Sequence, residues 1–354
     1  TRPRGLCSPE MPIRRFLAFR TYRDVPSTSR PLVSIVIPTF NRLRFLGEAL
    51  DSVAAQTLRD FEVIVVDDGS TEPVAEAVAG HPTKPRVIRQ PRQGPGAARN
   101  RGIAEAAADL IAFLDSDDLW QPTKLERFIS AFDTYPDTSI FYGPMQPILA
   151  AGEPVAGRTK PCHAGWITEA LFCSSFVHVP TVVCRRELLT REGGFDPALP
   201  VCEDYDLWLR MSVKESFGLV DEPLALRRLH PDRLSKSCMS RNLAVKAQVL
   251  RRFYESGAAQ NRLDQEVAAA RLARVCQAAG RAALRAAYFA QAVEFCRESR
   301  RYGGRSLQNA AALWTAAVLE RFKGNGREPA APSPLDTRAP YAFARPAQNE
   351  LTDL

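Results

Sequence analysis

Residues 110–120 read LIAFLDSDDLW, an apolar run that ends in three carboxylates. A run as apolar as 110–114 is typical of a strand covered on both faces, and open α/β sheets bind ligands outside the carboxyl ends of such strands. Asp115, Asp117 and Asp118 are therefore expected at a binding edge. Carboxylate oxygens suit Mg²⁺ or Mn²⁺, and an ion with few protein ligands keeps positions for substrate phosphates. The segment predicts a metal-assisted di- or triphosphate site.

A simpler interpretation is a strand-to-helix turn in which Asp and Ser only cap the helix that begins near Pro122. Asp and Ser are favoured at helix N-caps, and Pro is favoured in a first turn. Capping accounts for one carboxylate and leaves the other two without a role.

The rest of the first two thirds alternates between strand and helix patterns. Strands are predicted at 33–38, 61–66, 86–90 and 110–114, and helices at 43–56, 96–108 and 123–135. This alternation predicts an α/β fold with a doubly wound, mostly parallel sheet.

Composition sets the outer limits. The 354 residues, 45% of them hydrophobic, suffice for one large or two modest domains. The net charge of +7 favours acidic partners, but no tight Lys/Arg run with aromatics indicates nucleic acid. The eight Cys form neither a CxxC pair nor a zinc-like spacing, which fits a reducing cytoplasm. No apolar stretch reaches the length of a membrane span, so we expect a cytoplasmic protein, with peripheral contact at the inner face of the membrane left open.

Polar residues follow the other strands as well. Pro38, Thr39, Phe40 and Asn41 end the first strand, and Asp67-Asp68 end the second. An ionised carboxylate at 67 or 68 can accept hydrogen bonds from a base or ribose, but an Asx turn explains Asp67 equally well.

A Gly-rich turn spans residues 93–102 and carries Arg99 at the start of a predicted helix, which favours phosphate. The turn lacks the Walker lysine and the GxGxxG order. A P-loop kinase and a dinucleotide dehydrogenase are therefore disfavoured.

Six motifs together resemble the GT-A glycosyltransferases of family 2. They are VSIVIPTFNR (33–42), FEVIVVDDGST (61–71), GPGAARNRGI (94–103), IAFLDSDDLW (111–120), GGFDP (193–197) and CEDYDLWLR (202–210). The resemblance spans roughly residues 31–235. It implies a GT-A-like sheet, a nucleoside-diphosphate-sugar donor, most often a UDP-sugar, and a divalent metal, Mn²⁺ or Mg²⁺.

The resemblance also assigns roles to residues. Asp68 matches the aspartate that contacts the nucleotide base, and Asp115, Ser116, Asp117 and Asp118 match the DxD-type motif that binds ribose and metal-diphosphate. Asp204, with Glu203 beside it, matches the acidic pair that contains the catalytic base. The nucleotide-sugar site would comprise Pro38, Thr39, Phe40, Asn41, Asp68, Arg99, Asp115, Ser116 and Asp117, and the metal ligands Asp117, Asp118 and His230.

Sugar transfer itself demands the same division of work. The departing diphosphate must be neutralised, and an acceptor hydroxyl must lose its proton to a carboxylate that stays off the metal. A single displacement with such a base, Asp204, inverts the anomeric centre. The alternative is that Glu203 and Asp204 only stabilise the first turn of a helix through its dipole.

Two histidines are secondary candidates. His230 suits a metal or a phosphate, and a histidine simply satisfied in the core is an equal alternative. His178 precedes a predicted strand at 181–184 that would face an acceptor.

We expect four parts: an N-terminal extension (1–31), a GT-A catalytic domain (32–238), a helical C-terminal region (239–324) and a disordered tail (325–354). In the helical region, Ala/Leu/Arg stretches predict helices at 240–257, 261–279, 282–300 and 305–322. Packing on the catalytic domain is the favoured role of this appendage, ahead of dimerisation or contact with an anionic membrane.

The sequence therefore predicts an inverting, metal-dependent transferase that moves a sugar to a hydroxyl of a glycan or a lipid-linked acceptor. No QxxRW-like motif or membrane span follows residue 210, which favours a non-processive enzyme. A catalytically silent sugar-nucleotide-binding protein or scaffold is the alternative. A nucleotidyltransferase would be expected to carry a basic Gly-rich loop directly after the first strand.

Overall fold

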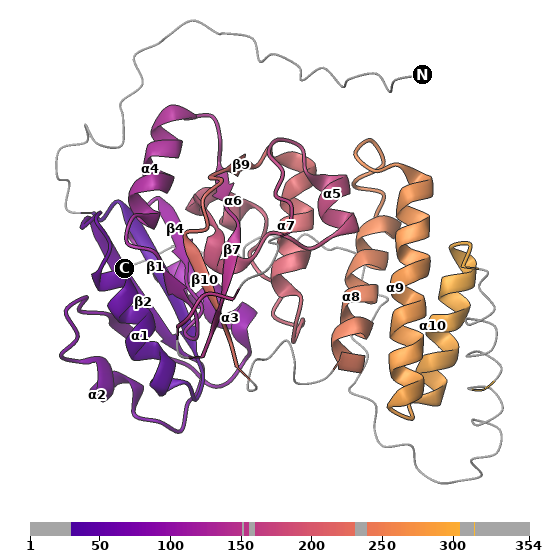
Figure 1. Cartoon of the computed structure of the whole chain (residues 1–354), viewed down its shortest axis with the longest axis horizontal. Helices are drawn as coiled ribbons and strands as arrows, with labels where there is room; N and C mark the ends of the chain where they lie inside the picture. The colour runs from indigo at the N-terminus through magenta and orange to yellow at the C-terminus, as the bar shows by residue number, and fades with distance from the viewer. Residues whose placement is uncertain (1–29, 151, 156–159, 231–238, 305–314, 316–354) are drawn as a thin grey trace, which may run out of the picture.

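A computed structural model describes residues 30–150, 152–155, 160–230, 239–304 and 315 (Figure 1). Its centre is a seven-stranded sheet with the order β3-β2-β1-β4-β8-β6-β9. The strands are β1 (Val33–Thr39), β2 (Phe61–Asp67), β3 (Arg86–Arg89), β4 (Leu110–Phe113), β6 (Ile140–Tyr142), β8 (Val183–Arg185) and β9 (Gly218–Leu219). Strands β1 to β4 pair in parallel, and only β8 runs antiparallel to its neighbours. The mostly parallel sheet is confirmed.

Helices cover both faces of this sheet, as the apolar strands require. They are α1 (Leu43–Ala54), α2 (Val74–Val78), α3 (Pro95–Glu105), α4 (Lys124–Thr134), α5 (Thr168–Cys173), α6 (Arg186–Arg191) and α7 (Glu203–Lys214), with a 3₁₀ turn, η1 (Val179–Thr181). On β1, Ile35 and Ile37 belong to the core that includes α1 and α4, whereas Val36 belongs to the core that includes α3 and α7. The alternation of β1 side chains between two cores is the doubly wound arrangement.

A second, three-stranded sheet was not predicted. It consists of β5 (Leu119–Trp120), β7 (Met145–Leu149) and β10 (Ala225–Leu229), with β10 in the middle. Strand β10 pairs antiparallel with β5, which directly follows the acidic segment 115–118. This pairing places a distant stretch of the chain against the predicted ligand edge.

The C-terminal region contains α8 (Met239–Glu255), α9 (Gln265–Arg285) and α10 (Phe289–Arg301), which stand side by side in Figure 1. Val249 and Leu272, on α8 and α9, belong to the same core as Trp208 of α7. The expected packing on the catalytic domain is therefore observed. No helix in the described ranges combines the length and the apolar character that crossing a membrane requires.

Two expected boundaries in this part of the chain differ from the structure. The predicted helix at 282–300 is divided, because α9 continues to Arg285 and the chain turns at Ala287, whose φ is 62°. The strand expected at 181–184 begins at Val183, after η1. The predicted helix at 305–322 lies outside the described residues except for position 315, the N-terminal extension does so except for positions 30 and 31, and the tail does so entirely.

The contact of α3 with β1 depends on a glycine. A Cβ atom at Gly102 would lie 2.3 Å from Val36 Cγ1, within the core. We expect Gly102→Ala to lower the free energy of unfolding by about 1–3 kcal/mol through overpacking. Gly47→Ala is the matched control, because a Cβ there meets nothing within 4 Å and Ala favours the helix by roughly 0.5–1 kcal/mol. Urea denaturation of both variants measures the difference, and equal effects would contradict the close approach.

Candidate functional site

The ends of β1 and β2 are tied to each other. The Asn41 backbone N–H donates to Ser70 Oγ at 3.0 Å, and the Thr71 N–H donates to Asn41 Oδ1 at 2.8 Å. Asn41 has a φ of 49°, a left-handed conformation that Asn adopts more readily than most residues. The predicted binding residues at the two strand ends thus belong to one connected edge.

The two adjacent aspartates after β2 have different partners. Asp67 Oδ1 accepts from the Ser70 N–H at 2.8 Å, which is the turn-forming role weighed above for Asp67. The buried Asp68 accepts from Gln90 Nε2 and from the backbone N–H groups of Gln93 and Gly94, all at 2.8–2.9 Å. Asp68 therefore positions the loop that leads into α3, and base contact by Asp68 stays a prediction.

Arg99 connects three of the motifs. Its side chain is buried, and it donates to Glu203 Oε1 at 2.6 Å and to Asp115 Oδ1 at 2.7 Å. Burial lowers the pKa of Arg99, but the two carboxylates outweigh burial and raise it overall, so the guanidinium stays charged. Arg99 was predicted to favour phosphate; in the structure it joins the end of β4 to the start of α7.

Asp204 lies beside this ion pair and forms no salt bridge within the described ranges of the chain. Its Oδ1 accepts from the Tyr205 N–H at 2.7 Å. Burial, followed by the charge of Glu203, raises the pKa of Asp204 to about 7, and Arg99 offsets part of the shift. Of the two adjacent carboxylates, Glu203 is paired with Arg99, whereas Asp204 has a pKa near neutral pH. A carboxylate whose pKa is raised towards neutral pH by burial and a neighbouring charge is typical of acid–base sites.

The backbone just before this pair is strained. Cys202, the N-cap of α7, has a φ of 62°, in the left-handed region that favours glycine. Such conformations cost on the order of 1–3 kcal/mol and persist only where the surroundings fix them. Here the conformation starts α7 so that Glu203 and Asp204 both lie in its first turn.

The GGFDP segment is clamped to α3. Asn100 Nδ2 donates to Phe195 O at 2.7 Å, and the Phe195 N–H donates back to Asn100 Oδ1 at 2.9 Å. Gly194, with a φ of 68°, leaves no space for a side chain, since a Cβ would lie 2.4 Å from Asn100 Oδ1. The clamp holds the loop before α7 against the helix that carries Arg99.

The other aspartates have partners from β10, from the residue after it and from the residues after β1. Asp117 Oδ2 accepts from Arg42 and lies 2.9 Å from His230 Nε2. Asp118 Oδ1 accepts from the backbone N–H of Arg228 at 3.0 Å, and Arg228 Nε donates to Asp117 O at 3.2 Å. Sequence reasoning named His230 but missed Arg42 and Arg228. Arg42 ends a quoted motif, whereas only the unpredicted second sheet places Arg228.

Two of the three predicted metal ligands are in contact in the structure. Across the ranges that the structure describes, no group of three or more His, Cys, Asp and Glu side chains has the arrangement of a metal site. Asp117 and His230 nevertheless meet, and His230 Nδ1 is buried without a hydrogen-bond partner among the described residues. An oxygen and an imidazole ligand suit an ion that takes its remaining ligands from a diphosphate and water.

The remaining predicted residues lie at the same edge or beside it. Thr39 Oγ1 is buried, with no hydrogen-bond partner in the described part of the chain, and Pro38 pairs in register with Val66 of β2. The Arg92 guanidinium lies 4.1 Å from the centroid of the Phe40 ring, and Ser116 is buried. His178 precedes η1, and its backbone carbonyl accepts from Thr181 Oγ1; a role for His178 towards an acceptor stays a prediction.

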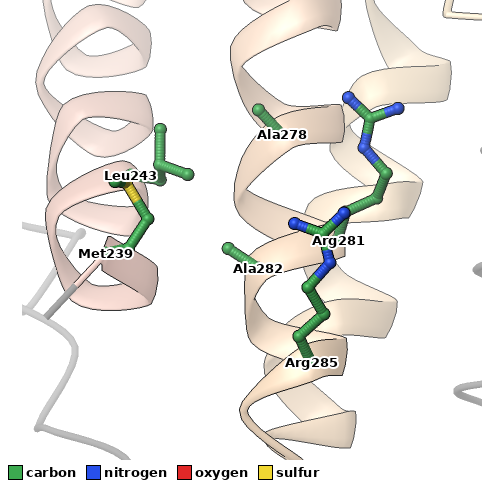
Figure 2. Close-up of a pocket in the computed structure, with 6 residues that line it drawn as sticks. All are labelled: Met239, Leu243, Ala278, Arg281, Ala282 and Arg285. Carbon is green, nitrogen blue, oxygen red and sulfur yellow. The ribbon is translucent and has the colours of Figure 1, made fainter.

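A pocket of about 410 Å³ lies elsewhere, between α8 and α9 (Figure 2). It is lined by Met239, Leu243, Ala278, Arg281, Ala282 and Arg285. No predicted site residue and no carboxylate lines it, so this pocket does not offer the chemistry of the candidate site.

Comparison with known proteins places the chain in a family. The model of "Glycosyl transferase family 2" matches residues 34–157. An uncharacterized glycosyltransferase of Haemophilus influenzae is 30% identical over 229 residues, which cover 63% of this chain and 77% of the relative. The chain belongs to glycosyl transferase family 2. An uncharacterized glycosyltransferase of Rickettsia felis is 32% identical over 200 residues, and the match spans 56% of this chain but only 33% of that longer protein.

Solved structures support the GT-A-like fold. S. aureus TarS 1–349 in complex with UDP-GlcNAc is 18% identical, with a TM-score of 0.53 and coverage of 82% of this chain and 91% of TarS. The mannosyltransferase PcManGT from Pyrobaculum calidifontis, in complex with GDP-Man and Mn²⁺, is 19% identical, with a TM-score of 0.52 and coverage of 83% and 81%. At this identity the likeness concerns the fold, which is α/β with a helical C-terminal region.

The environment of Asp204 gives a stability prediction. Because the folded-state pKa is raised from 3.8 to about 7, ionisation between those values destabilises the folded protein relative to the unfolded chain. The group's stabilising contribution is complete below pH 3.8 and is lost as the pH rises through 7. We expect Asp204→Asn to raise the thermal unfolding midpoint at pH 8 and to raise it progressively less towards pH 4.

Asp137→Asn, in an exposed turn, controls for the loss of one carboxylate. Differential scanning fluorimetry at several pH values compares the two variants. A gain for Asp204→Asn that does not depend on pH would contradict the raised pKa.

Proposed function

We propose that this protein transfers a sugar from a nucleoside-diphosphate sugar to a hydroxyl of a glycan or lipid-linked acceptor, with inversion at the anomeric carbon. Membership of glycosyl transferase family 2 supports the reaction class. Fold neighbours in complex with UDP-GlcNAc, UDP and GDP-Man support a sugar-nucleotide donor, and a UDP-sugar is the first candidate.

The observation that carries the proposal is the position of Asp204. It lies next to an ion-paired Glu203, with a pKa of about 7. A general base works best when its pKa is near the working pH, because it is then both ionised and able to hold a proton. In this role Asp204 takes the proton of the acceptor hydroxyl as that oxygen attacks the sugar from the face opposite the diphosphate.

The neighbouring charges keep the base free for this task. Arg99 occupies Glu203 and Asp115. Asp117 is directed to Arg42 and His230, and Asp118 to Arg228. Under the proposal, Asp68, Asp115 and the polar end of β1 bind the nucleoside, and the basic Arg42 lies near the diphosphate.

A divalent ion, Mn²⁺ or Mg²⁺, would be held by Asp117 and His230, with Asp118 nearby. Bound there, it would supply positive charge to the departing diphosphate. His230 Nε2 must then be unprotonated, and Arg42 must share Asp117 or leave it for a phosphate oxygen.

A catalytically silent binding protein or scaffold is the competing function. A silent protein would not need a carboxylate whose pKa is near neutral pH. Nor would it need the strained N-cap beside that carboxylate, where Cys202 has a φ of 62°. A nucleotidyltransferase is disfavoured by the residues after β1, Phe40-Asn41-Arg42, which form no Gly-rich loop.

Donor binding tests the site directly. We expect calorimetry to show that one of UDP, GDP and dTDP binds the full chain in the presence of Mn²⁺. Asp117→Asn should weaken this binding at least about tenfold, because it removes a metal ligand, whereas Asp204→Asn should leave it nearly unchanged. If a folded wild-type protein binds none of the three nucleotides, the donor site is wrong and the scaffold function becomes the better proposal.

Catalysis tests the base. With a donor and acceptor in hand, kcat/KM should fall below about pH 7 as Asp204 becomes protonated. Asp204→Asn should lower kcat by about 10²–10⁴-fold and abolish that acidic limb. A retained limb in Asp204→Asn would assign the titration to a different group.

A further inference from the structure

Three basic side chains that no motif includes lie around Tyr205, the residue after Asp204, and the nearby end of α5. They are Lys160, in the segment after β7, Lys246 on α8 and Arg271 on α9, and we call them the cationic cluster. Arg227 of β10 lies near Lys160. Folding thus gathers charges of one sign from separate elements of the chain.

Contacts place the three cations around Tyr205 and the end of α5. The Lys246 ammonium lies 5.3 Å from the centroid of the Tyr205 ring. The Tyr205 hydroxyl donates to Leu171 O at 2.8 Å, and Arg271 lies within hydrogen-bonding reach of the same hydroxyl. Lys160 Nζ donates to Ser175 O at 2.5 Å, just beyond α5. Tyr205 and α5 therefore form the shared support of the cluster.

The cations are close enough to repel one another. Burial lowers the pKa of Lys246, and the charges of Arg271 and Lys160 lower it further. Burial also lowers the pKa of Lys160, with further contributions from Arg227 and Arg271. Like charges held together are unfavourable unless a counter-charge joins them, so the cluster has an electrostatic demand for an anion.

The carboxylates of the described residues meet this demand only in part, through the charge of Asp204 acting on Lys246. In the described ranges, no ion pair links Lys160, Lys246 or Arg271 to Asp or Glu, and Arg271 Nε is buried with no hydrogen-bond partner there. Other cations around α7 are paired, as Arg99 is to Glu203 and Arg210 is to Asp206. A helix-end contact explains Lys160 alone, because a cation at the end of α5 faces free carbonyls. It does not explain Lys246 and Arg271.

The cluster also lies next to the proposed base. The Asp204 carboxylate raises the pKa of Lys246, and Lys246 lowers that of Cys202. The contacts of the Asp117–His230 group instead involve Arg42, from the end of β1. An anion on the cluster would thus approach the site beside Asp204, separately from the diphosphate.

We propose that Lys160, Lys246 and Arg271 bind an anionic group, a phosphate or a carboxylate, on the acceptor whose hydroxyl Asp204 deprotonates. Two lysines and an arginine provide both point charge and a guanidinium fork for such a group. The proposal rests on the proposed function and adds the class of acceptor, an anionic one. Lys160 is exposed and Lys246 and Arg271 are partly exposed, so the cluster is open to solvent.

The test measures anion binding by calorimetry on the full chain, with inorganic phosphate, D-glucuronate and neutral D-glucose as probes. Each titration is run with and without UDP and Mn²⁺. We expect phosphate, glucuronate or both to bind, glucose not to bind, and the anion to remain bound when UDP and Mn²⁺ are present. Which of the two anions binds identifies the group.

The variants Lys246→Met and Arg271→Met should each raise the dissociation constant of the anion at least about tenfold. The control Arg274→Met removes the same charge from an exposed position on α9 and should leave it unchanged. No binding to the wild type, displacement of the anion by UDP and Mn²⁺, or equal weakening in Arg274→Met would overturn the proposal.

Nucleotide binding by the same proteins separates this proposal from the proposed function. The donor nucleotide should bind to Lys246→Met and Arg271→Met as it does to the wild type. If no nucleotide binds but the anion does, the donor site fails and the acceptor assignment falls with it, although the anion site itself stands. If the nucleotide binds and the anion does not, only the cationic cluster is refuted.

Discussion

The double ion pair of Arg99 is the interaction on which the site depends. One buried guanidinium pairs with both Asp115, just after β4, and Glu203, at the start of α7, which follow it in sequence by 16 and 104 positions. Removing one partner of a buried charge pair typically costs about 3–5 kcal/mol, because the other charge remains unpaired. Arg99 also lies over Phe195, which Asn100 holds in place. The same residue thereby fixes where Asp204 lies and keeps its pKa from rising further.

Local patterns predicted the parts of the fold that depend on local chemistry. The apolar run 110–114 was correctly predicted as a strand and forms β4, with the carboxylates after its carboxyl end. A fully apolar strand must be buried on both faces, whereas the carboxylates that follow it must leave the core. The division of α9 from α10 was missed for two reasons. An Ala-rich sequence does not distinguish an apolar helix face from a polar one, and alanine is not a residue that predicts a left-handed turn, such as the one at Ala287. Arg228 and the cationic cluster were missed for a different reason. Their roles arise from pairings between residues far apart in the chain, which no spacing along a single element reveals.

The charge of the protein is unevenly distributed. Residues 239–304 contain twelve Arg and Lys against five Asp and Glu, an excess of seven that equals the formal charge of the whole chain. The remaining residues together are formally neutral. Lys246 and Arg271 are among these twelve, so the helical region supports the catalytic domain both through the shared core and through the field near Asp204. A basic isoelectric point, read alone, gives no hint of this asymmetry.

The pairing of β10 with β5 has a consequence for how the protein comes to be active. Asp118 accepts a hydrogen bond from a backbone N–H that is 110 residues further along the chain, and Asp117 contacts an imidazole that is 113 residues further along. Contacts of such long range form slowly, because the intervening loop must close first. During synthesis, a chain released only as far as α7 can assemble β1 to β4, but Asp118 then lacks Arg228 and Asp117 lacks His230. The acidic edge is therefore completed only after β1 to β4 have formed, and a partly made chain carries these strands before it carries the site.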